Sequence, residues 1–255
     1  MQLIYGIHAV ESLLRTNPKA VQRLCLQEGR DDKRIKALIE LARNQGVATV
    51  REPRASLDAM VAGRHQGAVA ETLEDSTRGD TPAANLWQEA DLLRHVENKA
   101  WPVLLLVLDG VTDPHNLGAC LRSADAAGVD AVIVPKDKSA DLNPTTRKVA
   151  CGAAEVVPFV RVTNIARTMK ALQERGVWFY GTAGESENTI YNSDLSGSVA
   201  LVMGAEGDGL RRLTREGCDH LVKLPMAGSV SSLNVSVATG VCLFEIVRQR
   251  LAAKQ

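Results

Sequence analysis

Three polar segments of the chain, each preceded by an apolar run, contain residue types that can bind a ligand and do chemistry. The first is NLGACLR at 116–122, which has an asparagine and an arginine near the start of a predicted helix. The second is MGAEGDGL at 203–210, where Glu206 lies among glycines. The third is LPMAGSVSSLNVSVATG at 224–240, where Asn234 lies in the first turn of another predicted helix. Amides and carboxylates can hold a polar ligand by hydrogen bonds, and an arginine can stabilise an anion.

The apolar runs that precede these segments are typical of strands buried on both faces of a parallel sheet. Such runs occur at 102–110, 130–135, 176–181, 198–204 and 220–225. Helical patterns lie between most of them, at 114–127, 144–150, 163–175 and 209–217, and a last helix starts near residue 231. This alternation predicts an α/β fold, with a parallel sheet and helices on both faces. Because ligands bind beyond the carboxyl ends of such strands, the three polar segments are placed to form one site.

The N-terminal part of the chain has a different pattern and predicts a separate small α/β domain. Helical periods at 7–15, 31–44 and 55–61 alternate with strand-like runs at 21–27, 47–50 and 68–72. A polar, turn-rich stretch at 74–82 is typical of a linker, and a helix is predicted at 83–98. We therefore expect a small domain at 1–75, a linker and helix at 76–100, and a larger domain at 101–255.

Composition limits the classes of function. The 30 Lys and Arg residues balance the 30 Asp and Glu residues, so any site for a polyanion must be a local cluster. The sequence has no membrane-length apolar run and no signal-peptide pattern, so we expect a cytoplasmic protein with no membrane partner. Five widely spaced cysteines without a CxxC motif favour reduced, buried thiols over disulfides or a zinc site.

Each polar segment also has a purely structural interpretation. Arg122 lies three residues before Asp125, so the two can pair on a solvated helix face. The glycines of 203–210 match neither a GxGxxG fingerprint nor a Walker A motif, and tight strand–helix turns often carry glycine. The serines of the third segment can cap a C-terminal helix that packs on the sheet. The apolar stripe of that helix is predicted at Leu233, Val237, Val241 and Phe244.

Taken together and in this order, the three segments resemble the SpoU/TrmH family of S-adenosylmethionine-dependent RNA ribose 2′-O-methyltransferases, within the SPOUT superfamily. YGIHAVESLL at 5–14 and HQGAVA at 65–70 are similar to the small L30e/L7Ae-like domain that some members carry. DGVTDPHNLGACLRSADAAGVDAVIVPKDKSADLN at 109–143 and GAAEVVPFVRVTN at 152–164 resemble members that methylate a guanosine of 23S ribosomal RNA in the peptidyl-transferase loop.

The resemblance implies a fold and a ligand that periodicity does not indicate. The family has a deep trefoil knot, which should involve roughly residues 181–240 here, and it forms homodimers through its motif helices. It takes S-adenosylmethionine, releases S-adenosylhomocysteine and needs no metal. The residues expected to hold the methyl donor are Gly204, Leu224, Met226, Leu233 and Thr182.

The resemblance also implies roles in catalysis and RNA binding. Arg122 is the expected catalytic arginine. Because a free guanidinium has a pKa above about 12 and is a poor base, we favour stabilisation of the developing alkoxide and contact with a neighbouring phosphate. The residues expected to orient Arg122 and the ribose are Asn116, Glu206, Ser232 and Asn234. Expected RNA contacts are Lys136, Lys138, Arg147, Lys148, Arg30, Lys33 and Arg34.

Three other functions remain open from the sequence. The chain can be a 2′-O-methyltransferase of transfer RNA, or a non-catalytic RNA-binding dimer that keeps the same fold. It can also be a nucleotide-dependent oxidoreductase on a doubly wound sheet, although the missing glycine fingerprint after the first strand counts against that. Within the ribosomal assignment, the substrate is either naked 23S ribosomal RNA or an assembly precursor.

Overall fold

The computed structural model describes residues 2–61, 63, 65–72, 85–100 and 102–253, and the chain divides into two compact units at 1–84 and 85–255. Residues 76–84 of the predicted linker and Trp101 lie outside the described residues. Within the described ranges, no helix combines the length and the apolar character that a membrane span requires.

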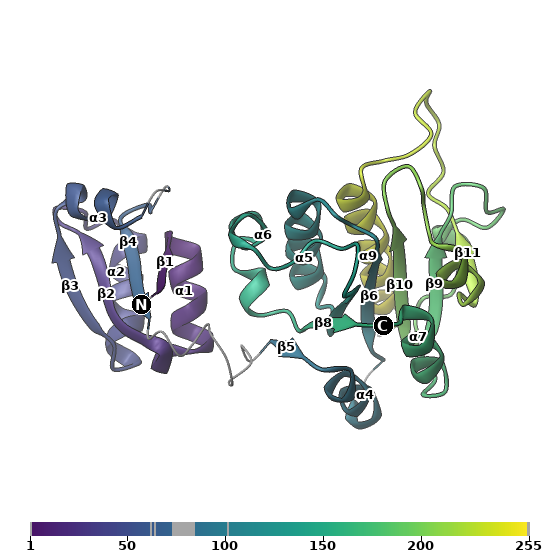
Figure 1. The fold of residues 1–255 in the computed structure, drawn as a ribbon, viewed down its shortest axis with the longest axis horizontal. Coiled ribbons are helices and arrows are strands. Elements are labelled where there is room, and N and C mark those ends of the chain that lie inside the picture. Colours follow the sequence, from purple (N-terminus) through teal and green to yellow (C-terminus); the bar gives the residue numbers. More distant parts are fainter. Residues whose placement is uncertain (1, 62, 64, 73–84, 101, 254–255) are drawn as a thin grey trace. The chain divides into compact units, whose positions relative to one another are not determined.

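The first unit is a four-stranded mixed sheet packed with helices (Figure 1). Its strands are β1 (Gln2–Tyr5), β2 (Val21–Gln27), β3 (Ala48–Glu52) and β4 (Ala68–Thr72). Its helices are α1 (Ile7–Thr16), α2 (Lys33–Asn44), α3 (Arg54–Met60) and the short 3-10 helix η1 (Pro18–Ala20). In the order β1-β4-β2-β3, β4 is antiparallel to both neighbours and β2 is parallel to β3. Val10, Leu14, Leu24 and Ile35 are buried between the sheet and helices α1 and α2.

The second unit is built on a seven-stranded sheet with the order β11-β9-β10-β6-β7-β8-β5. Every neighbouring pair of strands is parallel. The strands are β5 (Leu86–Trp87), β6 (Leu104–Asp109), β7 (Ala131–Pro135), β8 (Phe159–Val162), β9 (Trp178–Thr182), β10 (Val199–Gly204) and β11 (His220–Val222). The predicted α/β fold with a parallel sheet is therefore confirmed.

Helices cover both faces of this sheet (Figure 1). They are α4 (Glu89–Asn98), α5 (Pro114–Ala127), α6 (Pro144–Ala150), α7 (Ile165–Gln173), α8 (Arg212–Glu216) and α9 (Val235–Ala252), with 3-10 helices η3 (Ala153–Glu155) and η4 (Ile190–Asn192). Strand β6 shows the two cores most clearly, because its side chains alternate between faces. Leu104, Leu106 and Leu108 pack with α5 and α9, whereas Leu105 and Val107 pack with α4 and α7.

Local capping fixes where the helices of the site begin. Asp113 caps α5 by accepting from the backbone N–H of His115, and Pro114 occupies the first helical position, where no N–H is needed. The last helix begins at Val235 rather than near residue 231, because Asn234 is its N-cap and accepts from the backbone N–H of Ser236. The prediction that the serines cap this helix, with Asn234 inside its first turn, is therefore wrong.

The predicted apolar stripe of α9 is the exposed face of that helix, not the face on the sheet. Val237 and Phe244 are each 52% exposed, and Val241 is also exposed. The buried face is offset around the helix and consists of Val235, Thr239, Cys242, Leu243, Glu245 and Ile246. Helix α9 packs against α5 through this face, where Cys120 donates weakly to Thr239.

Candidate methyl-donor and RNA site

The three polar segments meet at the carboxyl edge of the large sheet. Strands β6 and β10 are neighbours and end at the same level, because Gly204 is the register partner of Asp109. The segment after β6 leads into α5, and the segment after β10 forms the glycine loop. The third segment follows β11, which lies two strands from β10, and it returns to the same place at the start of α9. The sheet therefore brings together residues that are far apart in the sequence.

A hydrogen-bonded junction joins the three segments. The side-chain amide of Asn234 donates from Nδ2 to Asn116 Oδ1 at 2.9 Å and to Glu206 Oε1 at 2.6 Å. Glu206 Oε1 also accepts from the backbone N–H of Val235 at 3.3 Å. Asn234 Oδ1 is meanwhile used by Ser236, whose backbone N–H and Oγ both donate to it. Each amide atom of Asn234 thus has a defined partner, which fixes the orientation of all three segments.

A cavity of about 600 Å³ opens beside this junction. All five residues predicted to hold the donor line it, namely Gly204, Leu224, Met226, Leu233 and Thr182. Three of the predicted orienting residues, Glu206, Ser232 and Asn234, line the same cavity. Asn116 lines a second cavity of about 610 Å³, which shares Glu206 with the first. The cavity sizes are typical of sites for nucleotide-sized ligands.

The lining of the first cavity suits a molecule with an apolar ring and a charged tail. Leu210, Leu224 and Met226 supply apolar surface, and the Glu206 carboxylate complements a cation. Gly204 lets the glycine loop fold back closely, since a Cβ at this position would overlap the backbone of Gly209 and Leu210. At the rim, Arg215 pairs with Glu185. These are the properties required for a nucleoside that carries a sulfonium and an amino-acid end.

Arg122 is not brought into either cavity. It lies on α5, six residues after Asn116, with an exposed side chain whose Nη1 donates to Cys151 Sγ at 3.7 Å. The alternative pairing with Asp125 is absent, because Arg122 contacts no carboxylate among the described residues. Cys151 is itself held in a left-handed conformation, with φ 53°, at the end of α6.

The basic residues predicted for the large domain fall into two groups. Lys136, Lys138 and Lys148 are exposed, and none of them pairs with a carboxylate within the described parts of the chain. Arg147, by contrast, is held by Glu155 at 2.5 Å and also donates to the Leu142 carbonyl. The three lysines are therefore free to contact a polyanion, whereas Arg147 mainly fixes the turn after α6.

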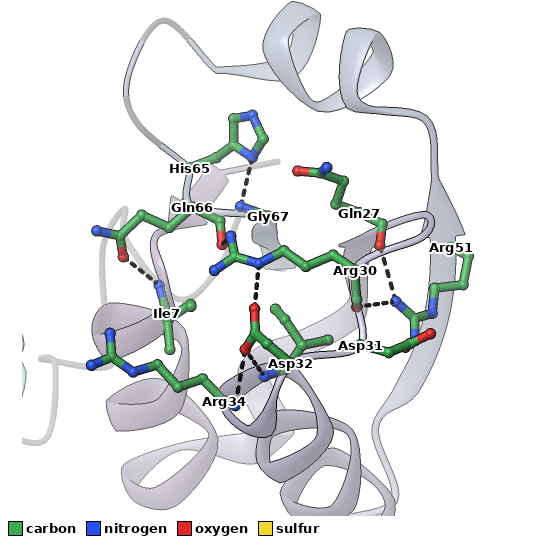
Figure 2. A network of polar contacts seen from close by, with 11 residues as sticks. Ile7, Gln27, Arg30, Asp31, Asp32, Arg34, Arg51, His65, Gln66 and Gly67 are labelled. Atoms are coloured by element: carbon green, nitrogen blue, oxygen red, sulfur yellow. Dashed lines mark hydrogen bonds and ion pairs between the residues drawn. The ribbon is translucent and has the colours of Figure 1, made fainter.

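In the first unit, Arg30 belongs to a hydrogen-bonded network that fixes two loops (Figure 2). It donates to Asp32 Oδ2 at 2.6 Å and to the Gln66 carbonyl at 2.7 Å. Asp32 in turn caps α2, and Arg51 donates to the carbonyls of Gln27 and Arg30. Lys33 and Arg34 lie in the exposed first turn of α2, where their charged ends remain in solvent.

Two residues of the site were not singled out from the sequence, Asp109 and Arg211. Asp109 is the last residue of β6 and is buried, and its Oδ2 accepts from the backbone N–H of Arg211 at 3.0 Å. The signal was present in the sequence, because an acidic residue at the end of an otherwise apolar strand must find a partner. The partner itself could not be found from local spacing, since Arg211 lies 102 residues further along the chain.

A parallel α/β sheet with a lined cavity beyond its carboxyl edge defines the class of protein that binds its ligand at the ends of the strands. Comparison with known proteins makes this specific. Residues 103–244 match the SpoU rRNA Methylase family, and residues 3–76 match the family described as RNA 2′-O ribose methyltransferase substrate binding. The chain belongs to the SpoU rRNA Methylase family, as the resemblance of the three segments predicted.

Full-length relatives and solved structures agree with this assignment. The 23S rRNA (guanosine-2′-O-)-methyltransferase RlmB of Pseudomonas syringae pv. tomato is 59% identical over 255 residues, covering 100% of this chain and 98% of that protein. The protein of the same name from Escherichia coli K12 is 57% identical over 250 residues, covering 98% and 99%. The SpoU methyltransferase AviRb from Streptomyces viridochromogenes, crystallised with AdoMet, superposes with a TM-score of 0.74 at 26% identity, covering 98% of this chain and 90% of that one.

Proposed function

We propose that this chain transfers a methyl group from S-adenosylmethionine to the ribose 2′-hydroxyl of a guanosine in 23S ribosomal RNA. The observation that carries the proposal is the junction of Asn116, Glu206 and Asn234 between two cavities, in a chain 59% identical over its full length to a 23S rRNA guanosine 2′-O-methyltransferase. The products are S-adenosylhomocysteine, the 2′-O-methylated nucleotide and a proton that passes to solvent.

The first cavity is the proposed donor site. Leu224, Met226 and Leu233 provide apolar surface for the adenosine part, and Thr182 and Gly204 lie at the ends of the two strands beneath it. When bound, S-adenosylmethionine supplies a methyl group that its positively charged sulfur has already activated. The Glu206 carboxylate, fixed by Asn234 and by the Val235 N–H, complements that positive charge.

The residues of the chain have two tasks in this reaction, to orient the ribose and to stabilise negative charge. Asn116, Ser232 and Asn234 orient the ribose and the loops by hydrogen bonding, which removes much of the entropic barrier. Arg122 stabilises the charge that develops on the 2′-oxygen as its proton leaves, and its permanently charged guanidinium also suits a neighbouring phosphate.

The exposed position of Arg122 is explained if the protein acts as a homodimer. Val237, Val241 and Phe244 form an exposed apolar face on α9, which lies beside α5, the helix that carries Arg122. Burial of such a face against a second copy is favourable, because it removes apolar surface from water. We propose that Arg122 reaches the ribose bound by the other copy in this dimer.

The domain assignments belong to the same proposal. Residues 1–75 form an L30e/L7Ae-like domain that binds RNA, 76–100 a linker and helix, and 101–255 a SPOUT catalytic domain. The match of residues 3–76 to a substrate-binding family supports the first assignment, with Arg30, Lys33 and Arg34 as its RNA contacts. Lys136, Lys138 and Lys148 are the proposed contacts of the catalytic domain, and Arg147, held by Glu155, would contact RNA only through the exposed part of its side chain.

A trefoil knot is proposed for the end of the catalytic domain. Two observations support it. The start of η4 pairs with the residue that follows β11, since the Ile190 N–H donates to the Lys223 carbonyl at 3.0 Å. The chain then continues past the junction at Asn234 and enters α9, which packs on α5.

We further propose that the protein works in the cytoplasm, on 23S ribosomal RNA or its assembly precursor. Its five free cysteines suit a reducing compartment.

Methyl transfer in vitro tests the function directly. The full-length protein would be incubated with S-adenosylmethionine labelled in its methyl group and with unmodified transcripts of 23S ribosomal RNA or transfer RNA. Nuclease digestion should then release label as 2′-O-methylguanosine from the ribosomal transcript only. Label in transfer RNA alone would establish the alternative substrate, and no label in either RNA would favour a non-catalytic RNA-binding protein.

A further inference from the structure

The second cavity lies next to the donor cavity and shares a wall with it. The shared wall contains Glu206, Asp208 and Leu210, all from the glycine loop after β10. Asn116 lies on the lining of the second cavity, and so do two cationic residues, Lys138 and Arg211. A ligand in the second cavity could therefore contact Asn116 and Glu206 while the methyl donor occupies the first cavity.

The guanidinium of Arg211 is held by protein contacts at Nε and Nη2, and its Nη1 is available to a ligand. Asp109, which is 1% exposed, accepts the backbone N–H of Arg211 at Oδ2, and its Oδ1 lies 3.4 Å from Arg211 Nε. Nη2 donates to the Lys138 carbonyl at 3.4 Å, while Nη1 has no hydrogen-bond partner among the described residues. The side chain of Arg211 remains 44% exposed, so its guanidinium is positioned but not saturated.

One oxygen of the Asp109 carboxylate has no hydrogen bond within the described residues, a feature that a structural ion pair does not require. Its buried Oδ1 makes no hydrogen bond to any described residue, although a buried carboxylate oxygen normally has one. Removing a charge from water is costly, and the Arg211 guanidinium, whose Nε lies 3.4 Å from Oδ1, offsets that cost here. Asp109 in turn holds Arg211 at the lining of the second cavity.

Lys138 is placed beside Arg211 by strained backbone. It has φ 56°, a left-handed conformation that is uncommon for a lysine. Such conformations cost free energy and are concentrated at functional sites. Lys138 follows β7 and Arg211 follows β10, so residues from two strand ends line the same cavity. The contact between them joins Arg211 Nη2 to the backbone carbonyl of Lys138.

We infer that the second cavity binds the acceptor nucleotide, with Arg211 and Lys138 holding an RNA backbone phosphate beside the ribose that contacts Asn116 and Glu206. A guanidinium suits a phosphate because its planar donors match two phosphate oxygens. The inference deepens the proposed function and rests on it.

The acidic residues of the cavity fit the same occupant. Asp109 is neutralised by Arg211, and Asp113 accepts from His115 at the start of α5. Glu206 accepts from Asn234, and only Asp208 lacks a contact within the described residues. Carboxylates at these positions can accept from ribose hydroxyls, which leaves Arg211 and Lys138 as the groups available to an anion.

The test compares Arg211→Gln with Arg212→Gln. Arg212 is a matched control, because it is the next residue, is more exposed, and pairs among the described residues only with Glu216 on its own helix. The readouts are the KM for a 23S ribosomal RNA transcript, the dissociation constant for S-adenosylmethionine, and the dependence of RNA affinity on salt. Arg211→Gln should raise the KM about tenfold and lower the salt slope by about 0.7–0.9, the value for one phosphate contact. Donor affinity should stay within about twofold, and Arg212→Gln should match the unmodified protein.

Two results would overturn the inference. One is an RNA affinity and salt slope for Arg211→Gln that equal those of Arg212→Gln, and the other is a loss of donor binding with RNA affinity unchanged. If Arg211→Gln does not fold, Arg211→Lys is measured in its place. Lysine keeps the charge but loses the planar guanidinium, so Arg211→Lys should keep the salt slope and raise the KM about threefold. An unchanged KM for Arg211→Lys would contradict the inference. Failure of the unmodified protein to methylate the transcript would instead refute the proposed function. The RNA affinities and salt slopes of Arg211→Gln and Arg212→Gln could still be compared, because they do not depend on methyl transfer.

Discussion

Asn234 and Asn116 lie 118 residues apart in the sequence, yet the Nδ2 of Asn234 donates to the Oδ1 of Asn116 at 2.9 Å. The same Nδ2 donates to Glu206, so one amide group connects all three polar segments of the site. Asn234 is also the N-cap of α9, so a single side chain both caps the helix and joins the three segments of the site. The two tasks can be separated by substitution.

Replacement of Asn234 by serine separates capping from the junction. Serine is as good an N-cap as asparagine, so capping of α9 should be retained. The free energy of unfolding should fall only by the loss of the two side-chain hydrogen bonds, about 1–3 kcal/mol. Serine has no amide to donate to Asn116 and Glu206, and the loss of hydrogen bonds to a charged group should lower turnover roughly 10- to 100-fold. Asn143→Ser is the matched control, because Asn143 caps α6 in the same way. Equal turnover of the two variants in a methyl-transfer assay would refute the role of the junction.

Gly204 is expected to tolerate no side chain. The methyl group of Gly204→Ala would overlap the backbone of Gly209 and Leu210, which cannot move aside as a flexible side chain can. The glycine loop must then open, and we expect donor affinity measured by titration calorimetry to fall more than about tenfold. Gly228→Ala is the control, since a Cβ there meets no atom within 4 Å. Donor binding by Gly204→Ala as tight as by Gly228→Ala would exclude the cavity as the donor site.

Thiol reactivity should single out Cys151. It is exposed, whereas Cys25, Cys120 and Cys242 are buried and Cys218 is partly buried. Burial raises the pKa of the Cys120 thiol to about 11 and that of Cys242 to about 12, so both stay protonated and unreactive at pH 8.

A thiol reagent should therefore modify one cysteine rapidly in the native protein and all five in denaturant, as counted by mass spectrometry. Because Cys151 Sγ accepts from Arg122, modification at this position should also slow methyl transfer, and Cys151→Ser should be protected from the effect. Rapid modification of several cysteines in the native state would contradict the described burial.

The exposed face of α9 should be the dimer interface. Phe244→Glu would place a charge within that face, and desolvation of an unpaired charge opposes association. We expect sedimentation equilibrium to give about twice the chain mass for the unmodified protein and the mass of one chain for Phe244→Glu at the same concentration. Leu213→Glu is the control, because Leu213 is equally exposed but lies on α8. A dimer that survives Phe244→Glu would place the interface elsewhere.

The elements that the sequence predicts best are those with strong local signals. Both α5 and α6 occur where predicted, because an Asp or Asn cap followed by proline marks each start. Five of the seven strands of the large sheet are also found, since their apolar runs are long. Strand β8 was missed, because its four residues include Arg161 and match no strong pattern.

Pairing between distant segments is the part that local sequence does not contain. Trp87 was predicted inside a helix, yet it lies in the two-residue strand β5, which exists only because it pairs with β8. The exposed stripe of α9 was not distinguishable from its buried face, because both are apolar. The partnership of Asp109 with Arg211 likewise depends on the order of β6 and β10 in the sheet.

The central claim is tested most directly in cells from which this chain has been deleted. Mass spectrometry of nuclease digests would measure 2′-O-methylguanosine in their 23S ribosomal RNA. We predict the loss of one such modification, its return with the unmodified protein, and no return with Arg122→Ala, which should still bind S-adenosylmethionine. An unchanged pattern of ribose methylation after deletion, or full restoration by Arg122→Ala, would contradict the account.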